Sequence, residues 1–211
     1  MKKILPILVI LIFLTAIYLY FFVELPDQMV SHWNELGEAD GYMNKFWGVF
    51  LMPIVSLFIY LMFTFVPRID PLKKNVEVFR KHFDRFILAI MVFFIYIYAL
   101  TIIWNLGIIY NMTAAIVPAL ILLLWFAGDL TKKAKRNWFI GIKTPWTLSS
   151  DEVWDKTNKL GGTLIQATAA IMCLGIIFPG YFVWLLMVPL LSSVAITLVY
   201  SYVIFKKISS K

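Results

Sequence analysis

Charged residues are scarce in this sequence. Asp, Glu, Lys and Arg make up 15% of the 211 residues, against about a quarter in ordinary soluble domains. Hydrophobic residues make up 62%, and the mean hydropathy is +0.85. A soluble fold of this length could not bury so much apolar surface. The composition instead predicts an all-α membrane protein that forms a single membrane domain over residues 1–211, because lipid accepts apolar side chains and helices satisfy their own backbone hydrogen bonds.

Cysteine and histidine are almost absent. The single cysteine, Cys173, excludes an intramolecular disulfide and a thiolate metal cluster. The two histidines, His32 and His82, are predicted on opposite sides of the membrane, and neither lies in an apolar segment where it could activate a nucleophile. His32 has acids nearby, but one imidazole is a weak sign of a metal site. We therefore expect no enzyme, no catalytic residue, no metal and no cofactor.

Long uncharged stretches dominate what is present, and one crossing of the membrane takes about 20 helical residues. Residues 4–23 and 46–67 are each one crossing long. Residues 86–128 and 160–205 contain 43 and 46 residues, so each stretch must turn back. Turn-forming residues lie at Asn105-Leu106-Gly107 and at Pro179-Gly180. The pattern predicts six transmembrane helices, at about residues 4–23, 46–66, 86–104, 111–127, 160–178 and 181–205.

Lysine and arginine are unevenly divided between the predicted loops. If the N-terminus lies in the cytoplasm, eighteen of the nineteen Lys and Arg fall on that side, and only Lys45 falls outside. Basic residues that flank membrane helices accumulate on the cytoplasmic side. We therefore expect a multi-pass protein of the cell membrane with both termini in the cytoplasm. The net charge of +7 then reflects topology and not direct nucleic-acid binding.

This topology leaves an outer loop at residues 24–45 and inner loops at 67–85 and 128–159. The outer loop carries five acids and one base, and its glycines favour turns. We expect it to be a compact, acidic and aromatic recognition surface. In the second inner loop, Ser149-Ser150-Asp151-Glu152 matches a capping box. It predicts a short helix along the inner membrane surface, with Trp154 at the depth of the lipid headgroups.

Two alternatives concern the membrane helices and the basic loops. Small residues from Gly161 to Ala170 predict a packing seam across which Gln166 forms hydrogen bonds. The same seam, with breaks at Pro53 and Pro179-Gly180, would form the path of a small-molecule transporter or permease. Ion-driven transport is disfavoured because no acid or base lies at mid-depth. The basic inner loops would either bind anionic membrane lipids or only fix the orientation.

Two groups of residues, one in each long loop, resemble known motifs. The first group is Leu25, Pro26, His32, Trp33, Asn34, Gly37, Asp40, Gly41, Tyr42 and Lys45. The second is Asn137, the run from Gly141 to Ser149, Val153, Trp154, Thr157, Asn158 and Gly161. The first group resembles the N-terminal domain of unknown function found in the SdpI family of bacterial immunity proteins, and the second resembles that family's other characteristic stretch.

The resemblance implies a function. In this family, the type member protects a cell against a secreted peptide toxin made by its kin, and it also holds a transcriptional repressor at the membrane once the toxin is sensed. By resemblance, the outer toxin-binding or ligand-binding site comprises His32, Trp33, Asn34, Gly37, Asp40, Gly41, Tyr42 and Lys45. The inner partner-binding site comprises Asn137, Gly141, Lys143, Thr144, Pro145, Trp146, Trp154 and Asn158. We expect toxin binding to rearrange the helices and expose residues 137–158, with Trp146 and Trp154 as contacts.

Overall fold

Six long apolar helices make up most of the computed structural model, which describes residues 4–210. Each helix is long and apolar enough to cross a membrane. They are α1 (Ile4–Phe22), α2 (Lys45–Ile69), α4 (Arg80–Asn105), α5 (Met112–Lys133), α7 (Asp151–Met172), which continues into the short α8 (Leu174–Ile177), and α9 (Phe182–Ser209). These features are those of a multi-pass membrane protein.

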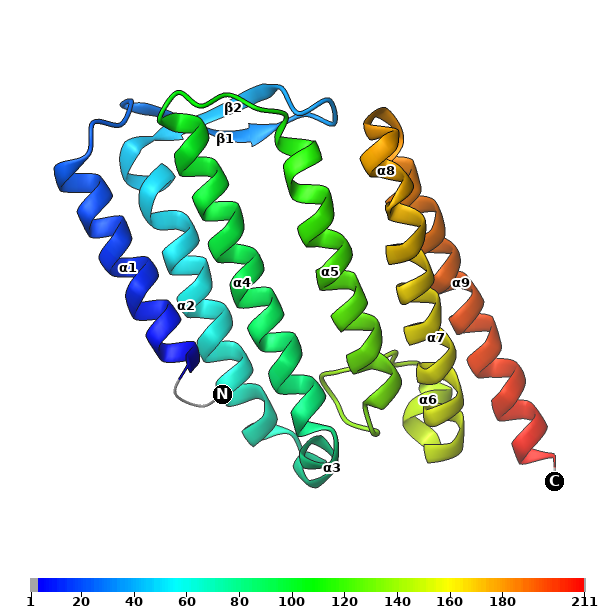
Figure 1. Cartoon of the computed structure of the whole chain (residues 1–211). Helices are drawn as coiled ribbons and strands as arrows, with labels where there is room; N and C mark the ends of the chain where they lie inside the picture. The colour runs from blue at the N-terminus through cyan, green and yellow to red at the C-terminus, as the bar shows by residue number, and fades with distance from the viewer. Residues whose placement is uncertain (1–3, 211) are drawn as a thin grey trace.

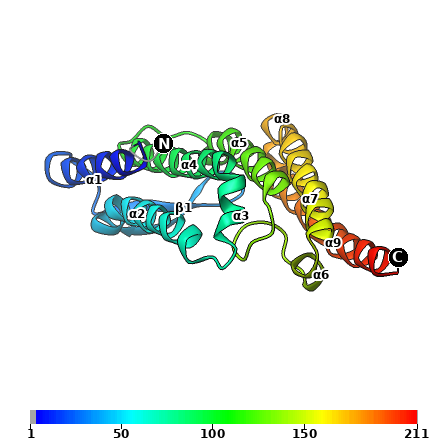
Figure 2. The same ribbon diagram turned by 90° about the horizontal axis from the view of Figure 1, so that it is seen from below.

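The helices form an elongated row in which the first and last lie at opposite ends (Figures 1 and 2). The start of α1 and the end of α9 lie on the same side of the bundle. On this side also lie α3 (Lys73–Val78) and α6 (Pro145–Ser149). The opposite side carries a β-hairpin of β1 (Gln28–Trp33) and β2 (Ala39–Asn44), which lies across the ends of α2, α4 and α5.

The hairpin corrects the expectation of an all-α fold, because the fold is mostly helical and includes one antiparallel two-stranded sheet. The strands pair from Gln28 with Asn44 to Trp33 with Ala39, with register shifts on either side of His32. The loop expected at residues 24–45 is therefore compact, as predicted, but it owes this compactness to backbone pairing.

The two connections expected on the inner side also contain more helix than the sequence predicted. In the stretch expected to be a loop at 67–85, α2 continues to Ile69, α3 follows, and α4 begins at Arg80. The helix expected from residue 160 begins at Asp151, and its N-cap is Ser150, whose side chain accepts a hydrogen bond from the Val153 amide. This helix runs directly into the bundle and not along the membrane surface. Trp154 is fully buried within the protein, so its ring is not open to lipid headgroups in this structure, and its depth in the membrane stays a prediction.

Two clusters of buried side chains form the core, one near each end of the bundle. The cluster on the hairpin side joins α1, α2 and α4 to Met29 of β1 and comprises Ile12, Ala16, Leu25, Met29, Val49, Tyr98 and Ile102. The cluster on the other side comprises Leu5, Val9, Val76, Phe79, Phe83, Ile87, Met91, Leu130, Ala134 and Trp154. The long helices expose large apolar side chains to their surroundings, as expected for helices in lipid.

A glycine contact brings α5 and α7 close together. A Cβ atom added to Gly128 would lie 2.7 Å from the Gly162 carbonyl oxygen and 2.6 Å from Gln166 Cγ. Beside this contact, Gln166 accepts a hydrogen bond from Lys132 Nζ at 2.5 Å and donates to the Trp125 carbonyl at 3.3 Å. The prediction that small residues form a packing seam bridged by Gln166 is confirmed.

We predict that Gly162→Ala lowers the thermal unfolding temperature of the protein in detergent, because the new methyl group meets the Gly128 carbonyl oxygen. Overpacking of this kind costs about 1–3 kcal/mol. The matched control is Gly175→Ala, where the added Cβ would have its nearest neighbour at 3.7 Å. Equal unfolding temperatures for the two variants would contradict the close approach of α5 and α7.

Candidate functional site

The β-hairpin is fastened to the bundle by the last residue of α4. Asn105 Oδ1 accepts a hydrogen bond from the Val30 amide at 2.8 Å, and Asn105 Nδ2 donates to the Val30 carbonyl at 3.0 Å. One side-chain amide therefore satisfies both polar groups of a buried residue in β1. The sequence indicated Asn105 only as a turn former, and its contact with residue 30 carries no local sequence signal.

The turn of the hairpin is fastened to the start of α5. Asn111 caps this helix by accepting a hydrogen bond from the Ala114 amide, and its Nδ2 donates to the Leu36 carbonyl at 2.8 Å. Gly37 adopts a φ of +81°, and a Cβ atom there would lie 2.5 Å from Asn111 Oδ1. Glycine is therefore required both for the backbone conformation and for the close approach. The turn is a fixed structure whose position depends on α5.

Exposed acids cover the hairpin and the linker that precedes it. They are Glu24, Asp27, Glu35, Glu38 and Asp40. His32 Nδ1 lies 2.5 Å from Asp40 Oδ1, and both side chains are open to solvent. Tyr42 is also exposed, at 61%. This face can offer carboxylates, an imidazole and a phenol to a molecule that approaches from outside the bundle.

Other residues of the expected outer site have structural contacts. Asn34 Oδ1 accepts hydrogen bonds from the amides of Leu36 and Glu38, both at 3.0 Å, and holds the turn. The Trp33 ring packs edge-on against Trp104 of α4, with 5.9 Å between centroids. Lys45 Nζ lies 5.3 Å from the centroid of the Tyr20 ring and donates to the Val23 carbonyl at the end of α1. Gly41 pairs with His32 across the sheet.

The segment from residue 134 to residue 150, named the inner segment after the side on which the sequence predicts it, is folded around two buried asparagines. Asn137 accepts hydrogen bonds from the amides of Phe139 and Ile140 at 2.9 and 2.7 Å. Its Nδ2 donates to two carbonyls of the same loop. Asn158 of α7 accepts from the Ile142 amide at 2.7 Å. Both side chains are at most 1% exposed, so they act as internal supports of the loop in this structure.

Three further residues of the expected inner site hold the segment against α7 and α9. Trp154 Nε1 donates to the Ala134 carbonyl at 2.7 Å. Thr144 caps α6 in a capping box with Thr147 and donates to Ser201 Oγ of α9 at 3.1 Å. Gly141 has a φ of +108°, and a Cβ atom there would lie 2.6 Å from Asn158 Oδ1. The motif residues in this segment therefore specify its shape.

The accessible part of the inner segment is a smaller set. Lys143 and Pro145 are exposed, and the half-buried Trp146 ring lies 5.1 Å from the Tyr202 ring, measured between centroids. Sequence reasoning missed Trp138 and Phe139, which are 53% and 41% exposed beside them. Their exposure follows from the turn around Asn137. The Asn137 side chain forms hydrogen bonds with the backbone of this turn, and the side chains of Trp138 and Phe139 remain on its solvent-exposed surface.

A carboxylate that the sequence did not single out joins the two inner connections. Asp70 is 2% exposed, accepts a hydrogen bond from the Leu72 amide at 2.7 Å, and accepts another from the Trp138 amide at 3.0 Å. Nearby, Asn75 Nδ2 donates to the Arg136 carbonyl at 2.7 Å. Asp70 and Asn75, which precede α4 in the chain, therefore fix the position of the backbone at Trp138 and Arg136.

The residues that the structure describes contain no metal cluster, and the two helix breaks that the sequence suggested for a transport path are not found within membrane helices. No group of three His, Cys, Asp or Glu side chains there could hold a metal ion. His32 and His82 belong to opposite ends of the bundle, and His82 Nδ1 lies 2.7 Å from Asp129 Oδ2. α2 passes through Pro53 as one helix, and Pro179 lies in the turn between α8 and α9. The two breaks expected for a transport path are thus not discontinuities within membrane helices.

Comparison with known protein families finds one match in the N-terminal part of the chain and one in the C-terminal part. A model described as a domain of unknown function (DUF1648) matches residues 7–57, which include the hairpin. A model described as the SdpI/YfhL protein family matches residues 133–201, which include the inner segment. "Immunity protein SdpI" of Bacillus subtilis (strain 168) is 28% identical over 211 residues, which cover 99% of this chain and 98% of that protein.

No solved structure matches the chain. The two matched regions contain the two groups of residues that carried the resemblance in the sequence, so that prediction is confirmed. The relationship to the Bacillus subtilis protein is distant but extends over nearly all of both chains. The chain is therefore similar to the SdpI/YfhL protein family over residues 133–201 and to the domain of unknown function (DUF1648) over residues 7–57, and it is a distant homologue of the Bacillus subtilis immunity protein.

Proposed function

We propose that this protein confers immunity to a secreted, membrane-active antimicrobial peptide, and that the acidic face of the β-hairpin receives the peptide at the outer surface of the cell membrane. The observation that carries the proposal is the hairpin itself, which is locked to α4 and α5 and turns its carboxylates outward. The distant relationship to an immunity protein supports it. No enzymatic step is needed, because binding alone would keep the peptide from the lipid.

The orientation we propose puts the hairpin outside and the ends of α1 and α9 in the cytoplasm. The distribution of Lys and Arg supports this orientation. Of the sixteen in the described chain, fifteen lie in the connections and helix ends on the side of the bundle opposite the hairpin. Lys45 is the exception. Lys2, Lys3 and Lys211, which the sequence prediction also counted as cytoplasmic, lie outside the described residues. Such an asymmetry is typical of cytoplasmic loops.

Charge complementarity defines the chemistry of the peptide. The linker and hairpin carry five exposed acids, whereas their one base, Lys45, is engaged with Tyr20 and the Val23 carbonyl. A cationic peptide would be attracted to this face before it reaches the lipid. Exposed aromatic side chains at Tyr42, Phe46 and Trp47 lie on the hairpin and the adjoining start of α2. They would contact the apolar face of the same peptide.

We further propose that the inner segment reports occupancy of the hairpin to a repressor protein in the cytoplasm. A continuous set of contacts joins the two ends. The hairpin turn is bonded to Asn111 at the start of α5, α5 packs on α7 at Gly128 and Gly162, and α7 holds the segment through Trp154 and Asn158. A peptide that binds one arrangement of these helices more tightly than another shifts the balance between them.

The partner surface would comprise Trp138, Phe139, Lys143, Pro145 and Trp146. These residues are exposed or half-buried in the arrangement described above. Asn137, Gly141, Thr144, Trp154 and Asn158, which the resemblance also implicates, would then act by shaping that surface. Helix movement that separates α7 from the segment would enlarge it.

Single cysteines test both the orientation and the coupling. In a Cys173→Ser background, we expect Leu36→Cys to react with a membrane-impermeant thiol reagent in intact cells, because Leu36 is 55% exposed at the hairpin turn. Trp146→Cys should react only in inside-out vesicles, and its labelling should rise when the peptide binds to the hairpin. The measurement is the labelling rate of each cysteine.

Lys206→Cys, at the end of α9, is the matched control, since it should label from the cytoplasmic side at the same rate with and without peptide. If Leu36→Cys and Trp146→Cys were both labelled from the same side of the membrane, the proposed orientation would be overturned. A Trp146→Cys rate that does not respond to the peptide would remove the reporting role and leave immunity standing.

Protection of sensitive cells tests the immunity role directly. Cells that lack their own immunity protein should survive the toxin of the producing strain when they express this chain. The double variant Glu35→Gln/Asp40→Asn should raise sensitivity, because it removes two exposed carboxylates from the hairpin. At about 0.2–1 kcal/mol for each exposed charge, we expect a shift of about 2- to 30-fold in the lethal peptide concentration.

The control is Glu152→Gln/Asp155→Asn, which removes two exposed carboxylates from the opposite side of the bundle. Equal amounts of each variant in the membrane are verified by immunoblot. Unchanged killing of cells that express the wild-type chain, by every secreted cationic peptide tried, would overturn the proposed function. Equal effects of the two double variants would overturn the role of the hairpin face.

A further inference from the structure

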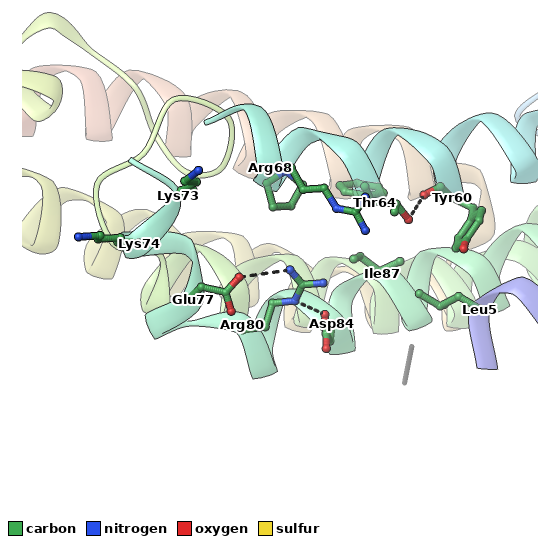
Figure 3. A pocket seen from close by; sticks show the side chains of 12 residues that line it. Leu5, Tyr60, Thr64, Arg68, Lys73, Lys74, Glu77, Arg80, Asp84 and Ile87 are labelled. Atoms are coloured by element: carbon green, nitrogen blue, oxygen red, sulfur yellow. Dashed lines mark hydrogen bonds and ion pairs between the residues drawn. The ribbon is translucent and has the colours of Figure 1, made fainter. Parts of the chain in front are cut away.

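A cavity of about 710 Å³ opens between α1, α2, α3 and α4 on the side opposite the hairpin (Figure 3). This volume lies within the range of small-molecule sites in proteins, about 300–1,000 Å³. Its walls include the last turns of α2 and the first turns of α4, where the apolar helices give way to charged connections. The cavity therefore spans the boundary between the apolar core of the bundle and its basic end.

Two guanidinium groups enter the cavity from opposite walls. Arg80 of α4 is held in place by two carboxylates, with Nε 2.8 Å from Asp84 Oδ1 of its own helix and Nη1 3.7 Å from Glu77 Oε1 of α3. Arg68 of α2 extends into the same space, as Figure 3 shows. Among residues 4–210, no carboxylate lies within ion-pair distance of Arg68, and its guanidinium carbon lies 5.6 Å from the centroid of the Phe65 ring.

The charge of the cavity is therefore not balanced by the protein. Lys73 and Lys74 of α3 stand at the end of the cavity away from Leu5, and neither has an ion-pair partner in the described chain. Four cations and two carboxylates line the cavity, which gives a formal net charge of +2. Like charges that face one space repel each other unless an anion lies between them. The cavity is thus complementary to an anionic group.

The other end of the same cavity is apolar. Leu5 of α1, Phe63 of α2 and Ile87 of α4 line it, and Ile87 belongs to the buried cluster on this side of the bundle. Thr64 also lines the cavity, but its hydroxyl donates to the Tyr60 carbonyl at 2.8 Å. A ligand that fills the cavity must therefore be charged at one end and apolar at the other.

We propose that this cavity is a binding site for one anionic phospholipid. Its phosphate lies between Arg68 and Arg80, Lys73 and Lys74 contact the outer part of the headgroup, and the acyl chains begin along Leu5, Phe63 and Ile87. Basic pockets between membrane helices bind anionic headgroups in this way. The position of the cavity at the polar boundary of the helices favours a lipid of the surrounding leaflet over a soluble anion, which would leave the apolar end empty.

The site also has a structural consequence. The lipid joins α1 and α2 to α3 and α4. Asn75 within α3 and Asp70 just before it are hydrogen-bonded to the backbone of the inner segment. A lipid bound in the cavity would therefore stabilise the backbone that supports the partner surface. The lipid site stands on the cavity alone and does not depend on the immunity proposal.

Native mass spectrometry of the full chain in detergent tests the site. Delipidated protein is titrated separately with phosphatidylglycerol, with zwitterionic phosphatidylethanolamine of the same acyl chains, and with inorganic phosphate. We expect one phosphatidylglycerol molecule to bind at concentrations at which the other two do not. Each basic residue near a headgroup contributes a factor of about five, so Arg68→Gln should weaken phosphatidylglycerol binding by about fivefold, and Lys73→Gln/Lys74→Gln by more.

The matched control is Lys206→Gln/Lys207→Gln, which removes an adjacent lysine pair from the end of α9 and outside the cavity. It should bind phosphatidylglycerol as tightly as the wild type does. Arg68 lies in α2, whereas Lys73 and Lys74 lie in α3. If the variant of one helix fails to fold, as judged by its elution from size-exclusion chromatography, the variant of the other helix still tests the site.

Three results would overturn the proposal. Equal affinity for phosphatidylglycerol and phosphatidylethanolamine would exclude recognition of the anionic headgroup. Competition by inorganic phosphate at the concentration at which phosphatidylglycerol binds would identify a soluble anion as the ligand. An equal loss of binding in the control and in the cavity variants would indicate general attraction to basic residues. A failed protection assay beside selective lipid binding would reject the immunity role and retain this site.

Discussion

Hydrogen bonds from asparagine side chains to irregular backbone hold both ends of this bundle in shape. The helices satisfy their own backbone groups, but the two-stranded hairpin and the inner segment pair only some of theirs, and unpaired buried amides are costly. Asn105 pairs with both polar groups of Val30, and Asn137 makes four bonds within one loop. An amide side chain suits this role because it both donates and accepts. The rest of the structure, including both proposed binding surfaces, depends on these bonds.

The two ends differ in charge and in what they offer a partner. The hairpin side carries exposed carboxylates, whereas the opposite side carries nearly all the lysine and arginine, including the cations of the cavity between α2 and α4. Between them the helices offer apolar surface and few polar groups. The contact at Gly128 and Gly162, flanked by the bond between Lys132 and Gln166, joins α5 to α7 tightly. These contacts are the route by which, in the proposed reporting role, a movement at the hairpin would reach the inner segment.

The sequence predicted the helices well because uncharged length and the spacing of lysine and arginine are local signals. It predicted the packing seam on α7, though not that α5 is its partner, because small residues at helical spacing favour close helix packing in lipid. It missed the strands at residues 28–44, where polar and apolar side chains do not alternate regularly, and it missed Asp70 and the roles of Asn105 and Asn111. Those roles depend on partners 68 to 75 residues away in the chain. The burial of Trp154 was not predicted, because an indole side chain suits a headgroup anchor as well as a buried hydrogen-bond donor.

Amide hydrogen exchange of the full chain in lipid nanodiscs tests the central claim most directly. Four amides outside the helices donate hydrogen bonds to asparagine side-chain oxygens and should therefore exchange slowly. They are those of Val30, Phe139, Ile140 and Ile142. In Asn105→Ala, exchange should become faster across residues 28–44 and stay unchanged across 137–142. Fast exchange of these amides in the wild-type protein, as in an unstructured loop, would contradict the account.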